Sequence, residues 1–292
     1  MKVIDCTTYF EEDLIMDIRF NILNRYVDKF IVCEASYSHS GNEKKINFDI
    51  NKFKKFKEKI VHLIVEKEPE GIISTQNNET DVLRINSIKR IAHQRNQIMK
   101  GLDDASQDDI IMYSDNDEIP NLENTNLKSL KEKIKNFKQK IFYYKFNLLY
   151  KKLDWYGTKC CKYKYLKNIS QLRHTKPKKY DFYRIDTLFS DSKFIDLKII
   201  QDGGWHFTNL KTPEDLMKKY LNDEMHSEFI KHKTNLDEIK RLVKERKINY
   251  DHFAKTNTPN KYINEFQLNK VDLDFLPSFL KENYSTYKEW FD

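Results

Sequence analysis

Apolar runs alternate with amphipathic segments along the first part of the chain. Short apolar runs bounded by polar residues are typical of buried strands, and they occur at residues 3–6, 30–35, 60–65 and 110–113. Between them, apolar residues at helical spacing predict helices over residues 13–24, 53–59 and 85–101. The last of these helices closes at Gly101, because glycine is a common helix end. Strands and helices that alternate in this way predict an α/β fold, with a mostly parallel sheet, right-handed crossovers and helices on both faces.

The pattern changes in the second half of the chain. Residues 140–149 and 194–200 have the composition of strands, and the glycine pair at residues 203–204 introduces another strand end. From Pro213 onward the pattern is helical and highly charged. We therefore expect a core over residues 1–210 and a helical C-terminal extension over residues 211–292 that packs on it.

Composition limits the classes of partner. The chain has 292 residues, of which 39% are hydrophobic, and a formal net charge of +7, so it can bury a sizeable core. The lysine-rich stretches at residues 52–59 and 131–140 alternate with apolar residues, as solvated helix faces do. Without a zinc knuckle, a helix-turn-helix signature or recognition-motif aromatics, we expect no nucleic-acid partner. The mild positive charge would still attract an anionic nucleotide.

The cysteines and the N-terminus predict a compartment. Cys6 and Cys33 lie in apolar runs, where buried free thiols are expected, and the adjacent Cys160 and Cys161 cannot both face one side of a strand. The chain contains no Cys-x-x-Cys pair, which fits a reducing compartment. The sequence shows no signal peptide and no apolar run of membrane-spanning length. We therefore expect a cytoplasmic protein without a membrane span.

The apolar run at residues 110–113 leads directly into a cluster of carboxylates, Asp115, Asp117 and Glu118, which Pro120 ends. Open α/β sheets bind ligands at the C-terminal ends of their strands. Carboxylates this close repel one another unless a cation or shared protons neutralise them, and Mg²⁺ and Mn²⁺ prefer such oxygen ligands. The spacing alone fits a divalent-cation site and a turn with a helix cap about equally well.

Short motifs that match one known family run along nearly the whole chain. They comprise Asp5-Cys6, Phe10-x-Glu12, Arg19, Val32-Cys33-Glu34-Ala35, His39-Ser40-Gly41, Gln94-Arg95-Asn96, Ser114–Pro120, Trp155-Tyr156-Gly157, Gly203–Phe207, His226-x-Glu228, Leu276-Pro277 and Asn283. The chain resembles glycosyltransferase family 17, the bisecting-type β-1,4-N-acetylglucosaminyltransferases. The most specific part of the resemblance is the Asp-x-Asp-Glu-Ile-Pro block with Gly-Trp-His-Phe downstream.

This resemblance implies a GT-A fold and an inverting transfer of N-acetylglucosamine from UDP-GlcNAc to a hydroxyl group of a glycan acceptor. It also implies a divalent cation, Mn²⁺ or Mg²⁺, as cofactor. Such a cation would bridge the two donor phosphates and stabilise the departing UDP. The residue pattern agrees on the fold class and the cation but does not by itself name the sugar.

Roles for individual residues follow as expectations. Asp117 is the first choice as metal ligand, with Asp115 contacting the ribose or the metal and His206 completing the site if its strand returns beside Asp117. A buried, hydrogen-bonded histidine is the alternative for His206. The residues expected to bind the donor are Asp5, Glu12, Glu34, Arg95, Asp115 and Trp205. Arg95 could equally form a surface salt bridge, and Trp205 could equally be part of the core.

The catalytic base is the remaining role. Inverting transfer needs a carboxylate that takes the proton of the acceptor hydroxyl while its oxygen attacks the anomeric carbon. Asp202, directly before the glycine pair, is the leading candidate, and Glu228 is the alternative. Asp202 would equally suit a turn before Gly203.

Two other functions compete with a metal-dependent transferase. A non-catalytic protein that binds sugar nucleotides or glycans could keep a degenerate transferase fold, but the intact acidic cluster, His206 and Glu34 favour the enzyme. A nucleotidyltransferase or phosphohydrolase also uses paired carboxylates. Such an enzyme normally carries a glycine-rich phosphate loop, and none is present in the sequence.

Overall fold

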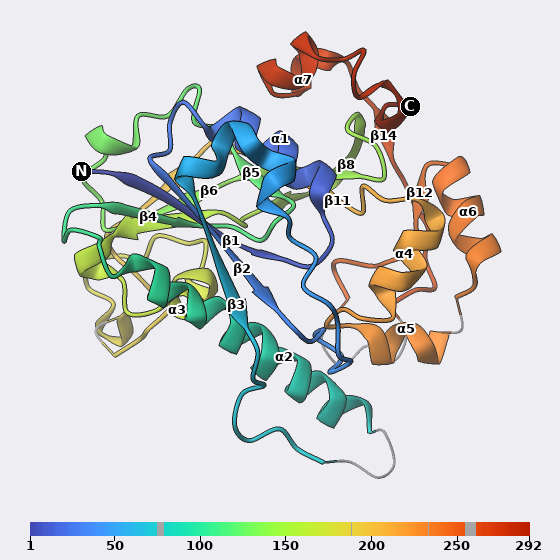
Figure 1. Ribbon diagram of the computed structural model, residues 1–292, viewed down its shortest axis with the longest axis horizontal. Coiled ribbons are helices and arrows are strands. Elements are labelled where there is room, and N and C mark those ends of the chain that lie inside the picture. Colours follow the sequence, from blue (N-terminus) through green and yellow to red (C-terminus); the bar gives the residue numbers. More distant parts are fainter. Residues whose placement is uncertain (75–78, 188, 233, 255–260) are drawn as a thin grey trace.

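The computed structural model describes residues 1–74, 79–187, 189–232, 234–254 and 261–292 (Figure 1). It is a mixed α/β fold built around two mixed sheets, with strand orders β10-β6-β9-β4-β1-β2-β3 and β14-β8-β7-β11-β5. A two-stranded ribbon, β12-β13, completes the described strands.

The first sheet contains the four strands that the apolar runs predict. They are β1 (Val3–Tyr9), β2 (Lys29–Ala35), β3 (Ile60–Val65) and β4 (Ile110–Tyr113). β1 pairs in parallel with both β2 and β4, and β2 pairs in parallel with β3. Their C-terminal ends therefore meet at one edge of the sheet, where the acidic motif begins.

Helices cover both faces of this sheet. α1 (Asp13–Leu23) and the 3₁₀ segment Ile50–Lys59 pack on one face, while the 3₁₀ segment Ile98–Leu102 and α3 (Ile169–His174) pack on the other. α2 (Thr80–Gln97) contacts β1, β2 and β3. Figure 1 shows α1 above the sheet and α2 and α3 below it. The two layers have separate apolar cores, because alternate residues of each strand point to opposite faces.

The first sheet is mostly parallel, as expected, and one of its described strands runs against the other six. β9 (Lys159–Lys162) lies antiparallel between β4 and β6 (Ile134–Phe137), and β10 (Leu197–Ile200) pairs in parallel with β6. Cys160 fills the core on one face and Cys161 the core on the other. Because β9 is buried on both faces, its short sequence shows no alternation that identifies it as a strand.

The second sheet continues directly from the acidic motif. It contains β5 (Glu118–Pro120), β7 (Gln139–Tyr143), β8 (Leu148–Trp155), β11 (Gly204–Thr208) and β14 (Asn269–Lys270). The strand expected over residues 140–149 is two strands, because the chain turns at Tyr144, whose φ is 64°. β11 runs parallel to β7 and antiparallel to β5, with His206 opposite Glu118 in the register.

The chain after residue 210 is not only helical, which corrects the expected extension. It contains α4 (Pro213–Tyr220), α5 (His226–His232), α6 (Leu236–Lys244), β12 (Lys247–Ile248), β13 (Phe266–Gln267), β14 and α7 (Ser278–Glu282). β14 joins the second sheet beside β8, and α7 packs on α1. The boundary at residue 210 stays a prediction. Across the described ranges, no helix is long and apolar enough to cross a membrane.

Short 3₁₀ segments occur along the connections between these elements. They are Leu127–Ser129, Tyr163–Tyr165, Ile185–Thr187, Leu273–Phe275 and Lys288–Trp290. The last of them lies beside the second sheet, because the carbonyl of Trp290 accepts the amide of Phe146. The C-terminal end thus packs against the turn region between β7 and β8.

Candidate active site

A pocket of about 270 Å³ opens at the C-terminal ends of β1, β2 and β4, and we call it the central pocket. Residues from both sheets, from α2 and from the connection after α4 line it. They include Thr8, Tyr9, Phe10, Glu12, Tyr37, His39, Lys44, Gln94, Arg95, Asp115, Asn116, Asp117, Glu118, Trp155, His206, Lys219, Asp223, Glu224 and Met225. The predicted edge of the sheet thus carries a concave site rich in charged side chains, as ligand sites of open α/β sheets do.

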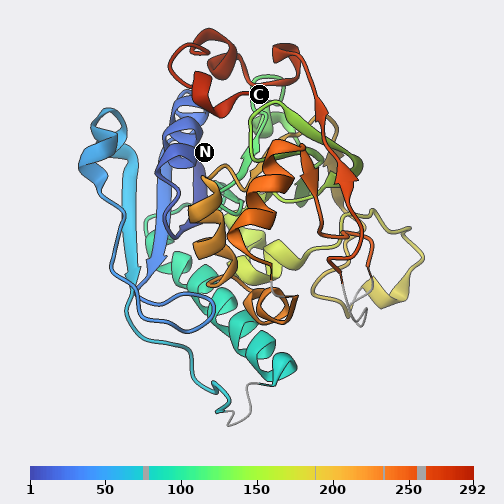
Figure 2. The same cartoon turned by 90° about the vertical axis from the view of Figure 1, so that its right-hand side faces the viewer.

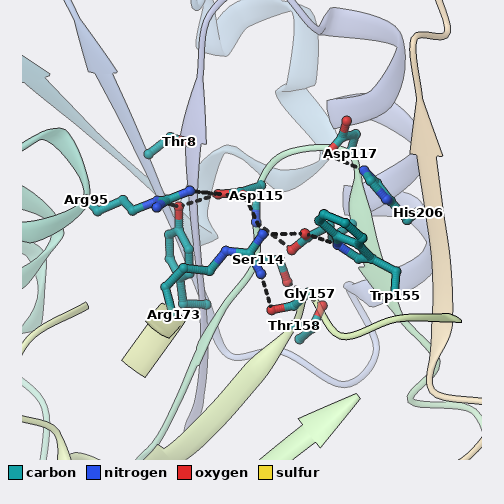
Figure 3. Close-up of polar contacts among 12 residues, drawn as sticks. Thr8, Arg95, Ser114, Asp115, Asp117, Trp155, Gly157, Thr158, Arg173 and His206 are labelled. Carbon is teal, nitrogen blue, oxygen red and sulfur yellow. Dashed lines mark hydrogen bonds and ion pairs between the residues drawn. The ribbon is translucent and has the colours of Figure 1, made fainter. Parts of the chain in front are cut away.

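Two guanidinium groups hold Asp115. Arg95 of α2 donates through Nη2 to both carboxylate oxygens, at 2.9 and 3.1 Å, and Arg173 of α3 donates to Oδ2 at 2.7 Å (Figure 3). The hydroxyl of Tyr113 adds a bond of 2.7 Å to Oδ1. Burial alone would raise the pKa of Asp115, but the two arginines keep it well below its ordinary value. The repulsion expected within the acidic motif is thus relieved here by arginines.

Glu118 belongs to the same network and is fully buried. Its Oε1 accepts bonds from Trp155 Nε1 at 2.5 Å and from Arg173 Nη2 at 2.8 Å, and its Oε2 accepts the amide of Asp115 at 3.0 Å. Gly157 lies directly against this carboxylate, and a Cβ at that position would overlap it. The Trp-Tyr-Gly block therefore supplies both a donor and the space for Glu118.

Asp117 faces a different partner. The turn after β4 carries it to the start of β5, where its backbone carbonyl accepts the amide of Phe207 at 2.8 Å. His206 Nε2 lies 3.4 Å from Asp117 Oδ1, so the expected return of this strand beside the motif is present. Burial alone would raise the pKa of Asp117, but the neighbouring His206 lowers it. The ring of Trp155 stacks on His206, with centroids 4.7 Å apart, and fixes its orientation.

The fit of a divalent cation can be judged from these side chains. Among the described residues, no group of three or more His, Cys, Asp or Glu side chains is arranged to hold a metal ion. Asp117 and His206 nevertheless present an oxygen and a nitrogen to the same pocket, 3.4 Å apart. Mg²⁺ sites commonly use only one or two carboxylates and take their remaining ligands from substrate phosphates and water. The pair therefore fits a cation that is completed by a bound diphosphate.

Two of the expected donor-binding carboxylates are already held by the protein. Asp5 is buried and forms a bidentate ion pair with Arg19, at 2.6 and 2.7 Å, and the described lining of the central pocket does not include it. Glu34 is fully buried and binds Lys44 at 2.5 Å and the amides of Asn47 and Phe48 at 2.8 and 3.0 Å. Glu34 therefore fixes the chain beside the pocket, and its oxygens are not free to accept bonds from uracil.

Glu12 and Arg95 do line the central pocket. Glu12 Oε2 accepts the amides of Phe10 and Glu11, both at 2.9 Å, and so shapes the turn that follows β1. The guanidinium group of Arg95 donates hydrogen bonds to the carboxylate of Asp115 and to the hydroxyl of Tyr113. Both residues thus occupy their expected places, with protein partners of their own.

Three other expected residues lie away from the pocket. Asp202 is 84% exposed and pairs with Lys140 at 3.6 Å, in a separate depression that Trp205 also lines. Trp205 points to the opposite side of β11 from His206 and donates to the carbonyl of Phe275 at 2.7 Å. Glu228 of α5 pairs with Arg84 and Lys261, at 3.4 and 3.0 Å. The structure does not bring either expected base to the acidic motif.

The sequence reasoning missed four residues of this region. Arg173 lies in a helix with no recognisable motif, and Lys219 and Asp223 lie in a charged stretch that resembles any solvated helix. Trp155 belongs to the Trp-Tyr-Gly motif, whose sequence alone does not indicate a role. Its spacing to Gly157 and its aromatic type were the only available signals.

Comparisons with known proteins cover nearly the whole chain. The model of glycosyltransferase family 17 matches residues 1–288. No curated protein matches the sequence.

Two similar solved structures are of one protein, HddC from Yersinia pseudotuberculosis. The first is 10% identical, covers 70% of this chain and 92% of that chain, and has a TM-score of 0.33. The second, HddC complexed with GMP-PN, is 12% identical, covers 75% and 97%, and has a TM-score of 0.36. Similarities at these TM-scores do not establish a common fold.

Proposed function

Because the chain belongs to glycosyltransferase family 17 and is thus an N-acetylglucosaminyltransferase by family, we propose that it transfers N-acetylglucosamine from UDP-GlcNAc to a hydroxyl group of a glycan, with inversion at the anomeric carbon. The family match over residues 1–288 carries the choice of sugar. The central pocket, at the C-terminal edge of the first sheet, supports the choice of a nucleotide donor.

The core is proposed to be of the GT-A type. Four parallel strands in the order β3-β2-β1-β4 support this, as does the Asp-x-Asp motif that follows β4. In such a core the nucleotide would lie over the ends of β1 and β2, between Thr8–Phe10 and His39. Burial and the neighbouring Arg95 lower the pKa of His39 to about 4, so a neutral imidazole would face the nucleotide.

Asp117 and His206 are proposed to hold a divalent cation, Mn²⁺ or Mg²⁺, together with the diphosphate of the donor. When bound, such a cation neutralises the diphosphate and favours departure of UDP. The short distance between the two side chains and the pocket they share support this assignment. Trp155 would act by holding the His206 ring in place.

Asp115 is proposed to hold Arg95 and Arg173 in place rather than to bind the cation directly. Both of its oxygens already accept bonds from guanidinium groups, and Arg173 also reaches Glu118 at 2.8 Å. The two carboxylates and the two arginines balance in charge, so this cluster adds no net charge to the pocket. Lys219, whose ammonium group donates to Asn209 at 2.9 Å, would supply positive charge near the diphosphate.

The test combines donor choice with cation dependence. Purified protein is incubated with UDP-GlcNAc, UDP-glucose or UDP-galactose, with Mn²⁺ or with EDTA, and both UDP release and the melting temperature are measured. UDP-GlcNAc at about a hundred times its Kd should add about 2.7 kcal/mol to the free energy of unfolding, and only with the cation present. Equal stabilisation in EDTA would contradict the cation, and equal turnover of all three donors would contradict the sugar.

A further inference from the structure

A second cavity, of about 490 Å³, lies behind the wall that His206 and Trp155 form, and we call it the aromatic cavity. Side chains of the second sheet, of α4, α5 and α6 and of residues 248–252 line it. In Figure 2 the helices α4, α5 and α6, drawn in orange, lie toward the viewer beside this sheet. The two cavities share His206, Trp155, Lys219, Asp223 and Met225, so they meet at one junction.

The lining of the aromatic cavity combines rings with polar groups. The rings include Tyr143, Tyr144, Tyr220, Tyr250 and Tyr262. The hydroxyl of Tyr143 bonds His252 Nε2 at 2.5 Å, which fixes both side chains. A pyranose has an apolar C–H face that packs on aromatic rings and a rim of hydroxyls that needs hydrogen bonds. Ligand cavities usually combine these two kinds of lining.

Unsatisfied polar atoms also point to a ligand. The Nδ1 of His206 and the Oγ1 of Thr234 are both buried, and neither has a hydrogen-bond partner in the described part of the chain. Both residues line the aromatic cavity. Buried polar groups are almost always paired, so hydroxyl groups of a bound molecule would account for them.

The junction contains several carboxylates, and most of them are occupied. Asp115 and Glu118 are bound to arginines, and Glu12 to two backbone amides. Asp117 faces His206. The carboxylate that lines both cavities is Asp223, in the connection between α4 and α5.

Asp223 has few partners. Its Oδ1 accepts the amide of Met225 at 2.8 Å, and no lysine, arginine or histidine within the described ranges forms an ion pair with it. Burial raises its pKa to about 6, although Lys219 acts in the opposite direction. A general base works best when its pKa lies near the working pH.

We propose that the aromatic cavity is the acceptor subsite, which binds a pyranose ring of a glycan, and that Asp223 accepts the proton of the attacking hydroxyl group. This inference rests on the proposed function, because it places the acceptor opposite a UDP-sugar in the central pocket. It replaces Asp202 and Glu228 in the role of base.

The step balances as a single displacement. The acceptor oxygen forms a bond to the anomeric carbon of the donor sugar while the bond from that carbon to the phosphate oxygen breaks. UDP leaves with the bonding electron pair, and the hydroxyl proton passes to the Asp223 carboxylate. The product is the β-glycoside if the donor is the α-linked UDP-sugar.

The first part of the test concerns binding. Protein loaded with UDP and Mn²⁺ is mixed with methyl α-mannoside, methyl β-galactoside or methyl β-N-acetylglucosaminide, and saturation-transfer NMR measures their binding. At least one glycoside should bind, and Tyr250→Ala should weaken it about tenfold, which corresponds to about 1.4 kcal/mol, while the Kd values of UDP and UDP-GlcNAc stay unchanged.

Three results would overturn the acceptor subsite. The first is that none of the glycosides binds the wild-type protein, and the second is that Tyr250→Ala binds them with normal affinity. The third is that Tyr250→Ala weakens the binding of UDP-GlcNAc but not of UDP, which would make the cavity the site of the donor sugar. Absence of UDP-GlcNAc binding to wild-type protein is a separate result, and it would overturn the proposed donor.

The second part of the test concerns the base. Asp223→Asn should lower the rate of transfer to the bound glycoside by about 10²- to 10⁴-fold and leave the Kd of UDP-GlcNAc unchanged. Asp237→Asn is the matched control, because Asp237 lies exposed in the first turn of α6. This variant should transfer at the wild-type rate. Normal transfer by Asp223→Asn would overturn its role as base.

Discussion

The two sides of the central pocket hold their acidic side chains differently. On one side, Asp115 and Glu118 share Arg173, and Asp115 also binds Arg95. On the other side, the ion-pair partner of Asp117 in the described part of the chain is His206, and Asp223 is not ion-paired there. The carboxylates on one side are therefore neutralised by arginines of the protein. The carboxylates on the other side keep negative charge, which is available to bind the proposed cation and to accept the proton of the acceptor hydroxyl.

The backbone explains how one motif serves both sides. Asp115 follows β4 of the first sheet, and the amide of Glu118 bonds back to its carbonyl at 3.0 Å, which makes a tight turn. After this turn the chain enters β5 of the second sheet, beside β11. The acidic motif is thus the crossing from one sheet to the other, so residues only two positions apart have different neighbours. Figure 3 shows Asp115 between the arginines and Asp117 on the other side with His206.

The largest effect is expected from the side that is not neutralised. Asp117→Ala should lower the rate of transfer by about 10³-fold or more, because it removes a group proposed to hold the cation that stabilises UDP. The melting temperature should stay close to that of the wild type, because within the described residues Asp117 is ion-paired with His206 alone, and the nearby Lys219 keeps its bond to Asn209. A variant that keeps more than about a tenth of the wild-type rate would contradict this role.

Asp115→Ala should affect the stability of the fold more than the rate of transfer. It removes the shared partner of two nearly buried guanidinium groups, and breaking a buried ion pair typically costs about 3–5 kcal/mol. We expect the lower end, about 3 kcal/mol, because Tyr113 and Glu118 still bind the arginines and Asp115 is 26% exposed. Chemical denaturation measures this loss. Asp115→Asn keeps the shape and a hydrogen-bond acceptor and should lose less, so equal losses in the two variants would count against the ionic origin.

The pH dependence of transfer should report Asp223. A base must be unprotonated to accept a proton, and the pKa of Asp223 is raised to about 6 by burial. The groups that face it are Lys219, Glu224, Tyr220, Tyr250 and Tyr262. Activity should therefore be close to full at about pH 7 and above and half of that near pH 6, and well below pH 6 it should fall about tenfold for each pH unit. The residual activity of Asp223→Asn should lack this limb, and a limb that persists unchanged would assign it to another group.

The sequence predicted the first sheet well for a physical reason. β1 to β4 are parallel, and β1, β2 and β4 are buried on both faces, so these strands are short apolar runs that stand out from their charged surroundings. β3 is an equally apolar run, although it lies at the edge of the sheet and is only partly buried. β9 and the division at Tyr144 were missed, because a four-residue strand and a single positive φ leave no periodic signal. These features depend on contacts between segments far apart in the chain.

The site was predicted in part. The place of the acidic motif and the return of His206 beside Asp117 both follow from strand ends, which sequence patterns locate. The partners of Asp5 and Glu34 could not be seen, because Arg19 and Lys44 become neighbours only when the chain folds. Asp223 lies in a charged connection whose pattern matches that of a solvated surface. Burial, which gives this carboxylate its properties, is not visible in the sequence.

The smallest effect is expected at Asp202, the base that the sequence favoured. Its side chain is 84% exposed and its φ is 46°, a conformation that asparagine adopts readily. It lies with Trp205 in a depression apart from the central pocket, and Lys140 is its ion-pair partner at 3.6 Å. Exposed pairs of this kind contribute little to stability. Asp202→Asn should therefore keep the wild-type transfer rate and melting temperature when it is assayed beside Asp223→Asn. A rate loss of about a hundredfold with unchanged donor affinity would instead restore Asp202 as the base and remove that role from Asp223.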